Sequence, residues 1–208
     1  KFLRMKENLL INPLKPGLKL SEAGNKAIFL LFLFKHRFRI PLTFILPANF
    51  YEDYLRDEQL FLEGLRNEIQ DLPQKTYAIR SSAKSEDTEE FTCAGQFQTI
   101  TNVEGSDNIL KAVLDVWKSA SMSGETEYHK KISNKASGCA VLIQEMIGSK
   151  LAGVSFSKNP ITNQDEIIIE AVEGPGENLV QKGVTPFRWK FRKDKMLEGN
   201  PEYPLISV

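Results

Sequence analysis

The chain has 208 residues, of which 41% are apolar, and its 27 Lys and Arg residues balance 27 Asp and Glu residues, so its formal charge at pH 7 is zero. This length fits one large domain or two small lobes, and the apolar content is enough for a packed core, which excludes a disordered chain. Zero net charge excludes a general electrostatic attraction to nucleic acid or to acidic membranes, so we expect neither as a partner.

The first predicted element is a buried helix that includes the apolar run Ala27 to Phe34. The run is too short to span a bilayer, which needs about 20 residues. The cations Lys35, His36 and Arg37 follow it, as is typical of the last turn of a helix. No signal-peptide pattern precedes the helix, and the two cysteines form no disulfide framework. We therefore expect a cytoplasmic protein.

The next elements are short apolar strands and amphipathic helices. Prolines bound the first of these strands, and apolar residues recur at helical spacing in the longer segments. The clearest predicted helix begins at Ser106 and Asp107, whose residue types are frequent at helix N-termini. The predicted order is strand, helix, helix, strand, strand and helix, over residues 41–47, 49–55, 59–72, 77–79, 97–102 and 106 onward.

A polar, serine-rich stretch from Ser119 to Gly138 interrupts this pattern. Strand patterns dominate after it, in the segments CAVLIQEMI, LAGVSFS, IIIEAV and FRWKFRK. Turn residues between the second and third of these predict a hairpin. The sequence therefore predicts an α+β fold of two lobes with mixed and antiparallel sheets, the first over residues 1–135 and the second over residues 136–208.

Two cations lie where a phosphate-binding site could form. Lys26 follows Gly24 at a predicted helix start, where backbone N–H groups and a point charge can meet a phosphate. Arg80 ends an apolar strand, and a guanidinium can donate to two phosphate oxygens at once. The small-residue loop 92–96, which contains Gly95, could close over a phosphate chain. As alternatives, the lysine could be an exposed turn residue, and the arginine could pair with a nearby carboxylate, Glu86 or Asp87.

Two later segments are weaker candidates. The strand that ends in Gln144, Glu145, Met146 and Ile147 is suited to a hinge whose backbone reads an adenine edge, although an ordinary hairpin strand is the alternative. Glycines before Glu177 permit a tight turn and close approach of a ligand, although a plain loop is the alternative. No Cys and His spacing typical of a metal site occurs, so we predict no metal ligands in this chain.

The order of these motifs resembles a known family. The segments GNK, RSSA, ED, AGQFQT, QEMI, AGVSFSKNP, GPGE and GVTP follow one another between Glu22 and Trp189. This series is similar to the nucleotide-binding domain of the phosphoenolpyruvate synthase and pyruvate phosphate dikinase family. The resemblance implies an ATP-grasp-like fold, with a phosphate-binding first lobe and a partial second lobe that carries the adenine-binding hinge.

The resemblance also implies roles for individual residues. Lys26 and Arg80 would bind the phosphates of ATP and act in catalysis. A mobile loop would cover the phosphates, the hinge would line the adenine and ribose site, and a glycine-rich turn would shape the floor of the cleft. These parts correspond to Ala94, Gly95 and Gln96 in the loop, to Gln144, Glu145, Met146 and Ile147 in the hinge, and to Glu177 in the turn.

The reaction implied by the resemblance transfers a phosphoryl group from ATP to a histidine on a carrier domain and then to pyruvate. Mg²⁺ is expected in the full-length enzyme, with its ligands beyond Val208, as are the carrier and acceptor domains, so we expect this chain to be inactive alone. Two alternatives stay open: a nucleotide domain of the rifampicin or glucan phosphotransferase type, and a degenerate ATP-grasp module without catalysis.

Overall fold

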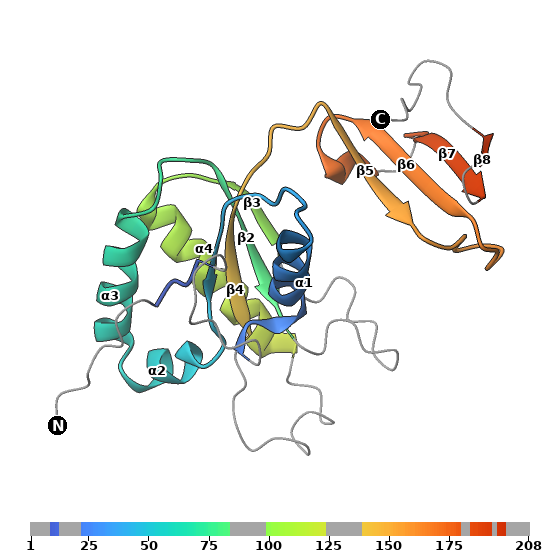
Figure 1. The fold of residues 1–208 in the computed structure, drawn as a ribbon. Coiled ribbons are helices and arrows are strands. Elements are labelled where there is room, and N and C mark those ends of the chain that lie inside the picture. The colour runs from blue at the N-terminus through green and yellow to red at the C-terminus, as the bar shows by residue number, and fades with distance from the viewer. Residues whose placement is uncertain are drawn as a thin grey trace. The chain divides into compact units, whose positions relative to one another are not determined.

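The computed structural model describes residues 9–12, 22–83, 99–123, 139–179, 184–192 and 195–198. The chain forms two compact units, Lys1–Met146 and Ile147–Val208. Each unit contains a four-stranded antiparallel sheet, and the α-helices belong to the first unit (Figure 1). This combination confirms the predicted α+β class.

The sheet of the first unit contains β1 (Thr43–Leu46), β2 (Tyr77–Ser82), β3 (Thr99–Val103) and β4 (Ala140–Glu145), in the spatial order β1-β4-β2-β3. The sequence predicts β4 in the second lobe because a serine-rich stretch precedes it. The structure instead pairs β4 with both β1 and β2, so the two units meet at Met146. Pairing partners far apart in sequence leave no local signal, which is why the pattern of residues alone does not reveal this arrangement.

Three helices cover one face of this sheet: α2 (Phe50–Arg56), α3 (Glu58–Gln70) and α4 (Ser106–Ser123). Their apolar sides pack against alternate residues of β2 and β4, because successive side chains of a strand point to opposite faces. The indole N–H of Trp117 donates to the carbonyl oxygen of Cys139 at 2.9 Å. The main buried residues of this layer are Phe61, Leu65, Tyr77, Ile79, Val113, Val116, Trp117, Val141 and Ile143.

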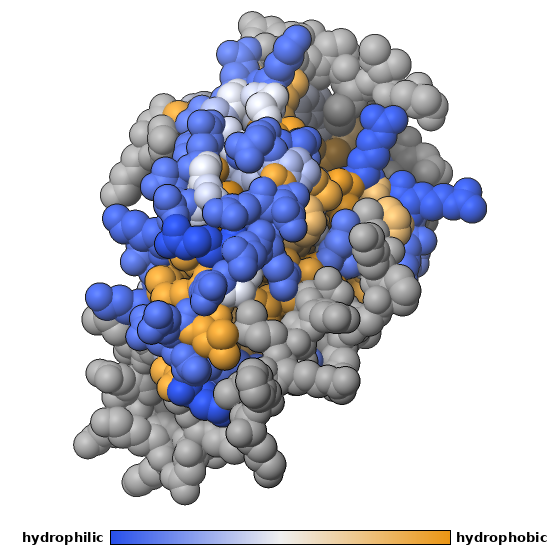
Figure 2. Space-filling view, turned by 90° about the vertical axis from the view of Figure 1, so that its left-hand side faces the viewer, coloured by the Kyte–Doolittle hydropathy of each residue, from blue (hydrophilic) through white to orange (hydrophobic). Residues whose placement is uncertain are grey.

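The outer surface of α3 is polar, as its amphipathic pattern predicts. Its buried residues Phe61, Leu65 and Ile69 recur on one side of the helix, whereas Glu63, Arg66 and the residues beside them are exposed. The side of the molecule that carries α2 and α3 is accordingly mostly hydrophilic, with scattered apolar patches (Figure 2).

Helix α1 (Gly24–Lys35) lies on the other face of the sheet (Figure 1). It contacts the strands through small residues: Ala23, before its first turn, and Ala27 pack against Ile45, Ala140 and Leu142. The predicted helix is confirmed, but its predicted burial is wrong for the outer side. Phe29 and Phe32 are 61% and 54% exposed, because only the side with the small residues meets the sheet. No helix in the described part of the chain is long and apolar enough to cross a membrane.

The second unit is an antiparallel meander. Its strands are β5 (Leu151–Phe156), β6 (Ile167–Glu173), β7 (Phe187–Arg192) and β8 (Lys195–Glu198), which neighbour one another in chain order. The 3₁₀ helix η2 (Gly176–Leu179) follows β6. The predicted hairpin is confirmed by the pairing of β5 with β6.

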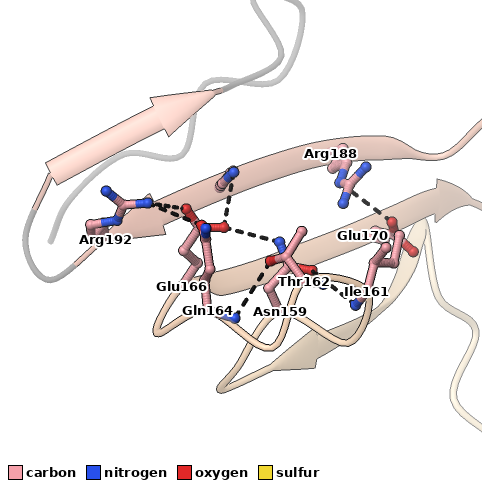
Figure 3. A network of polar contacts seen from close by, with 9 residues as sticks. Asn159, Ile161, Thr162, Gln164, Glu166, Glu170, Arg188 and Arg192 are labelled. Atoms are coloured by element: carbon pink, nitrogen blue, oxygen red, sulfur yellow. Dashed lines mark hydrogen bonds and ion pairs between the residues drawn. The ribbon is translucent and has the colours of Figure 1, made fainter.

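A buried carboxylate joins the turn before β6 to strand β7. The side chain of Glu166 is inaccessible to solvent and accepts hydrogen bonds from Lys190 Nζ at 2.9 Å, from Asn159 Nδ2 at 2.9 Å and from Arg192 (Figure 3). The hydrogen bonds from these donors lower the pKa of Glu166 to about 2, and the bond from Lys190 has the largest effect. The charge is therefore retained in the folded protein down to strongly acidic pH.

We predict that Glu166→Gln destabilises the second unit at pH 7, because it leaves Lys190 and Arg192 without their carboxylate. The pKa of the folded form, about 2, lies below the ordinary value of 4.5, so the stabilisation is complete above about pH 4.5 and is lost as the pH falls through about 2. The two proteins should therefore converge in stability toward pH 2. Urea unfolding followed through backbone NMR signals of β6 measures this.

Glu170→Gln is the matched control. Glu170 lies on β6, the strand that begins directly after Glu166, but its ion pair with Arg188 is longer, 3.6 Å, and partly exposed (Figure 3). Such a pair contributes at most about 1 kcal/mol. Equal unfolding midpoints for wild type and Glu166→Gln at pH 7 would show that the buried network adds nothing.

Candidate functional site

The start of α1 is held against the end of β2. Gly24 has a φ of +71°, and a Cβ atom placed there would lie 2.1 Å from the carbonyl oxygen of Ser82. The backbone N–H of Ala27 donates to Ser82 Oγ at 3.3 Å, and the N–H of Asn25 donates to the carbonyl oxygen of Ala83 at 3.3 Å. Only glycine allows this approach, which explains why a glycine precedes Lys26.

Lys26 is anchored at the same strand end. Its Nζ donates to the carbonyl oxygen of Ser81 at 2.9 Å. Ser81 follows Arg80 in β2. The ammonium group of Lys26 therefore lies beside the backbone next to Arg80, the other predicted phosphate-binding cation. The fold therefore places Lys26 against β2 one residue after Arg80.

Arg80 is partly buried on the face of the sheet that α1 covers. Ser82, two residues further along β2, bonds to α1, and residues two apart in a strand share a face. Arg80 Nη1 donates to Gln144 Oε1 at 3.0 Å. Gln144 lies on β4 and is also buried, so this bond links two residues that the sequence assigns to different parts of the predicted site.

The Nε atom of Arg80 is buried and has no hydrogen-bond partner among the described residues. Buried donors are normally paired, so an orphaned one requires an explanation. The alternative partners Glu86 and Asp87 lie outside the residues that the structure describes. The orphaned Nε–H is suited to an oxygen atom of a bound anion, and it fits the phosphate role predicted for this residue.

The side chains of Gln144 and Glu145, two adjacent residues of the predicted hinge, point to opposite faces of β4. Gln144 faces Arg80, whereas the side chain of Glu145 points to the opposite face of β4 and forms an ion pair with Lys75. That hydrogen bond from Lys75 lowers the pKa of Glu145. Met146 is partly buried at the end of the first unit, and Ile147 is exposed in the second unit.

The hinge backbone is also partly occupied. The N–H of Glu145 donates to the carbonyl oxygen of Leu42 at 2.8 Å, and the N–H of Met146 donates to that of Thr76 at 2.9 Å. Neither N–H is therefore free to read an adenine edge in this conformation. The structure thus brings one side chain of the predicted hinge, that of Gln144, into contact with Arg80.

The remaining predicted residues lie outside the described ranges or in the second unit. Ala94, Gly95 and Gln96 lie outside the described residues. Glu177 is exposed in η2 of the second unit, after the turn at Gly174, which has a φ of +80°. Within the described ranges, no three His, Cys, Asp or Glu side chains gather where they could hold a metal ion.

Sequence reasoning missed Thr43. Its hydroxyl donates to the carbonyl oxygen of Pro41 at 2.9 Å and accepts from Gln144 Nε2 at 3.1 Å, so it extends the contact between Gln144 and Arg80. The available signal was a single hydroxyl-bearing residue within the apolar strand PLTFILP.

The comparisons with known proteins bear on this geometry. Residues 44–200 match the family described as pyruvate phosphate dikinase, AMP/ATP-binding domain. The chain belongs to this family. The match covers β1 from its second residue onward and all of β2 and β4, the strands that carry Arg80 and Gln144.

Three relatives illustrate the range of similarity. An uncharacterized phosphotransferase of Bacillus subtilis, YvkC, is 32% identical over 188 residues, which are 79% of this chain and 23% of that protein. A probable phosphoenolpyruvate synthase of Staphylothermus marinus is 38% identical over 122 residues, 57% of this chain and 15% of that protein. The phosphoenolpyruvate synthase of Pyrococcus furiosus is 35% identical over 141 residues, 60% of this chain and 17% of that protein. The chain thus spans less than a quarter of the length of these relatives.

We predict that Gly24→Ala displaces the start of α1, because its Cβ would meet the carbonyl group of Ser82 and its φ is positive. Gly105→Ala is the matched control: its φ is +79°, but nothing lies within 4 Å of the added Cβ. The control loses about 1–2 kcal/mol for the left-handed backbone. Gly24→Ala should lose about 1–3 kcal/mol more, as overpacked sites do, in urea unfolding. Equal losses in the two variants would mean that the close approach of α1 to β2 is not constraining.

Proposed function

We propose that this chain is the nucleotide-binding part of an ATP-dependent phosphotransferase similar to phosphoenolpyruvate synthase. The observation that carries the proposal is the orphaned, buried Nε of Arg80, which lies on the same strand end as Lys26 in a chain of an AMP/ATP-binding family. Two cations that contact neighbouring parts of one strand, one of them with a donor that no described residue uses, are suited to a polyphosphate.

We further propose an ATP-grasp-like fold of two lobes, of which the first holds the phosphates. The presence of two units, each with its own antiparallel sheet, supports this proposal. The loop 94–96 would cover the phosphates, and Glu177 would shape the floor of the cleft. Gln144, Glu145, Met146 and Ile147 would contribute to the adenine and ribose site, where the thioether of Met146 offers a polarizable surface for a flat ring.

In this proposal Lys26 and Arg80 act on the charge of the transferred phosphoryl group. Phosphoryl transfer depends mainly on positioning and on neutralising the negative charge of the phosphate oxygens. Mg²⁺ is proposed for the whole enzyme, but the described residues gather no acidic cluster that fits it, so we assign it no step in this chain. The contribution of the chain is to hold the polyphosphate with two fixed cations.

For the whole protein, we propose that ATP phosphorylates a histidine of a carrier domain, which then phosphorylates pyruvate. The relatives named phosphoenolpyruvate synthase support an acceptor that yields phosphoenolpyruvate, and the histidine step is what the family resemblance implies. The name of the Bacillus subtilis relative specifies a phosphotransferase without an acceptor, so the acceptor depends on the synthase relatives alone. A transfer assay on the full-length protein, with pyruvate and phosphate as separate acceptors, tests this part.

Arg80→Lys tests the proposed phosphate site. Lysine keeps the positive charge but has no planar fork, so it cannot replace Nε and Nη donors together. Losing one charge-assisted bond costs roughly 1.5–3 kcal/mol of binding, so affinity for ATP should fall about ten- to a hundredfold. Stability without nucleotide should barely change. Isothermal titration calorimetry with ATP and urea unfolding without ligand measure the two effects.

Arg66→Lys is the control, because Arg66 forms an exposed ion pair with Asp107 on the helices of the opposite face. Its ATP affinity should match that of the wild type. If Arg80→Lys keeps full affinity but unfolds at lower urea concentration, Arg80 is a structural ion-pair residue, and the proposed site is wrong.

A further inference from the structure

Three hydrogen bonds connect the carbonyl group of Pro41 to the guanidinium of Arg80. Thr43 Oγ1 donates to the carbonyl oxygen of Pro41 at 2.9 Å, Gln144 Nε2 donates to Thr43 Oγ1 at 3.1 Å, and Arg80 Nη1 donates to Gln144 Oε1 at 3.0 Å. We propose that Thr43 is a positioning residue that fixes the orientation of the Gln144 amide and, through it, the guanidinium of Arg80. This inference rests on the proposed function, in which Arg80 binds phosphate.

The direction of the chain follows from the inventory of donors. A threonine hydroxyl has one hydrogen, and here the carbonyl oxygen of Pro41 takes it, since a carbonyl can only accept. The hydroxyl of Thr43 can therefore only accept from Gln144, which turns the amide nitrogen toward Thr43. An arginine has no acceptor, so Arg80 independently requires the amide oxygen of Gln144 on its own side. Both ends thus demand the same amide orientation.

Burial makes this orientation costly to change. Thr43 and Gln144 are 2% and 6% exposed, and they face each other directly in the pairing of β1 with β4. If Thr43 lacked its hydroxyl, the Gln144 Nε2 group would be left without this partner, and buried unpaired donors are strongly unfavourable. The orientation is therefore a property of the folded sheet.

The consequence for Arg80 is a restricted guanidinium. The group is planar, so a bond at Nη1 limits the directions in which its other donors point. No described residue accepts from the Nε donor in this arrangement. A donor that is oriented before the ligand arrives binds with a smaller loss of side-chain freedom. Thr43 would thus raise ATP affinity without touching ATP.

Thr43→Val removes the hydroxyl and nearly keeps the shape, and Thr43→Ser keeps the hydroxyl and removes the methyl group. With one hydrogen bond of ordinary strength lost from the chain, Thr43→Val should weaken ATP binding roughly three- to tenfold in calorimetry. The ATP affinity of Thr43→Ser should lie within about twofold of that of the wild type, because this variant keeps the hydrogen bond. The Arg80 Nε–H signal in ¹⁵N NMR should shift in Thr43→Val and stay in place in Thr43→Ser.

A double-mutant cycle separates positioning from stability. In the Arg80→Lys background, the effect of Thr43→Val on ATP affinity should disappear, because the planar group that it orients is gone. A threonine with a purely structural role would lower the urea midpoint of Thr43→Val and leave the ATP affinity and the Arg80 signal unchanged. That result, or an equal effect of Thr43→Val in both backgrounds, would overturn the proposal.

Two further outcomes are decisive. If the wild-type chain binds no ATP, the proposed function fails, and the Arg80 Nε–H signal alone then decides whether Thr43 orients the guanidinium. If Thr43→Val does not fold, the wild-type protein provides the test: the Thr43 hydroxyl proton should exchange slowly enough with water to be observed, as a buried donor does. Its rapid exchange would contradict the proposed bond chain.

Discussion

The insertion of β4 between β1 and β2 is the contact on which the candidate site depends. It places Gln144 opposite Thr43, 101 residues away in sequence, and within hydrogen-bonding distance of Arg80, 64 residues away. A buried amide on a central strand must find partners for both its oxygen and its nitrogen. Thr43 on β1 accepts from the amide nitrogen of Gln144, and Arg80 on β2 donates to its oxygen. These contacts therefore depend on β4 lying between β1 and β2.

The alternation of side chains along β4 then divides the site. Residues 140, 142 and 144 face α1, and residues 141, 143 and 145 face the helices of the other layer. This explains why Gln144 contacts Arg80 while Glu145, its neighbour, pairs with Lys75. Two adjacent residues of the predicted hinge thus point to opposite faces of β4.

The sequence predicts the elements well because their signals are local. An apolar run that stops at Arg80, and a glycine two residues before Lys26, are the local signals, and the structure places Lys26 against the residue that follows Arg80 in β2. The position of β4 in the sheet of the first unit and the exposure of Phe29 were not predictable, since both depend on which surfaces meet. Thr43 was missed for the same reason: a lone hydroxyl in an apolar strand has no meaning until Gln144 lies opposite.

Three charged groups, Glu166, Arg188 and Arg80, differ in how their charges are paired. Glu166 is surrounded by donors, two of them cationic, and its charge is neutralised within the fold. Arg188 also has an Nε without a hydrogen bond, but Glu170 Oε1 lies 3.6 Å from it. Arg80 differs from both, because among the described residues its only hydrogen bond goes to a neutral amide.

A cation that is held in place by a neutral partner keeps its charge available. An acidic partner would have anchored Arg80 as firmly, but it would compete with a phosphate for the same charge. Gln144 orients the guanidinium through one donor and neutralises nothing. An amide rather than a carboxylate at this position is therefore what a site for a polyphosphate requires. The hydrogen bond between Gln144 and Thr43 is in this way linked to the chemistry proposed for Arg80.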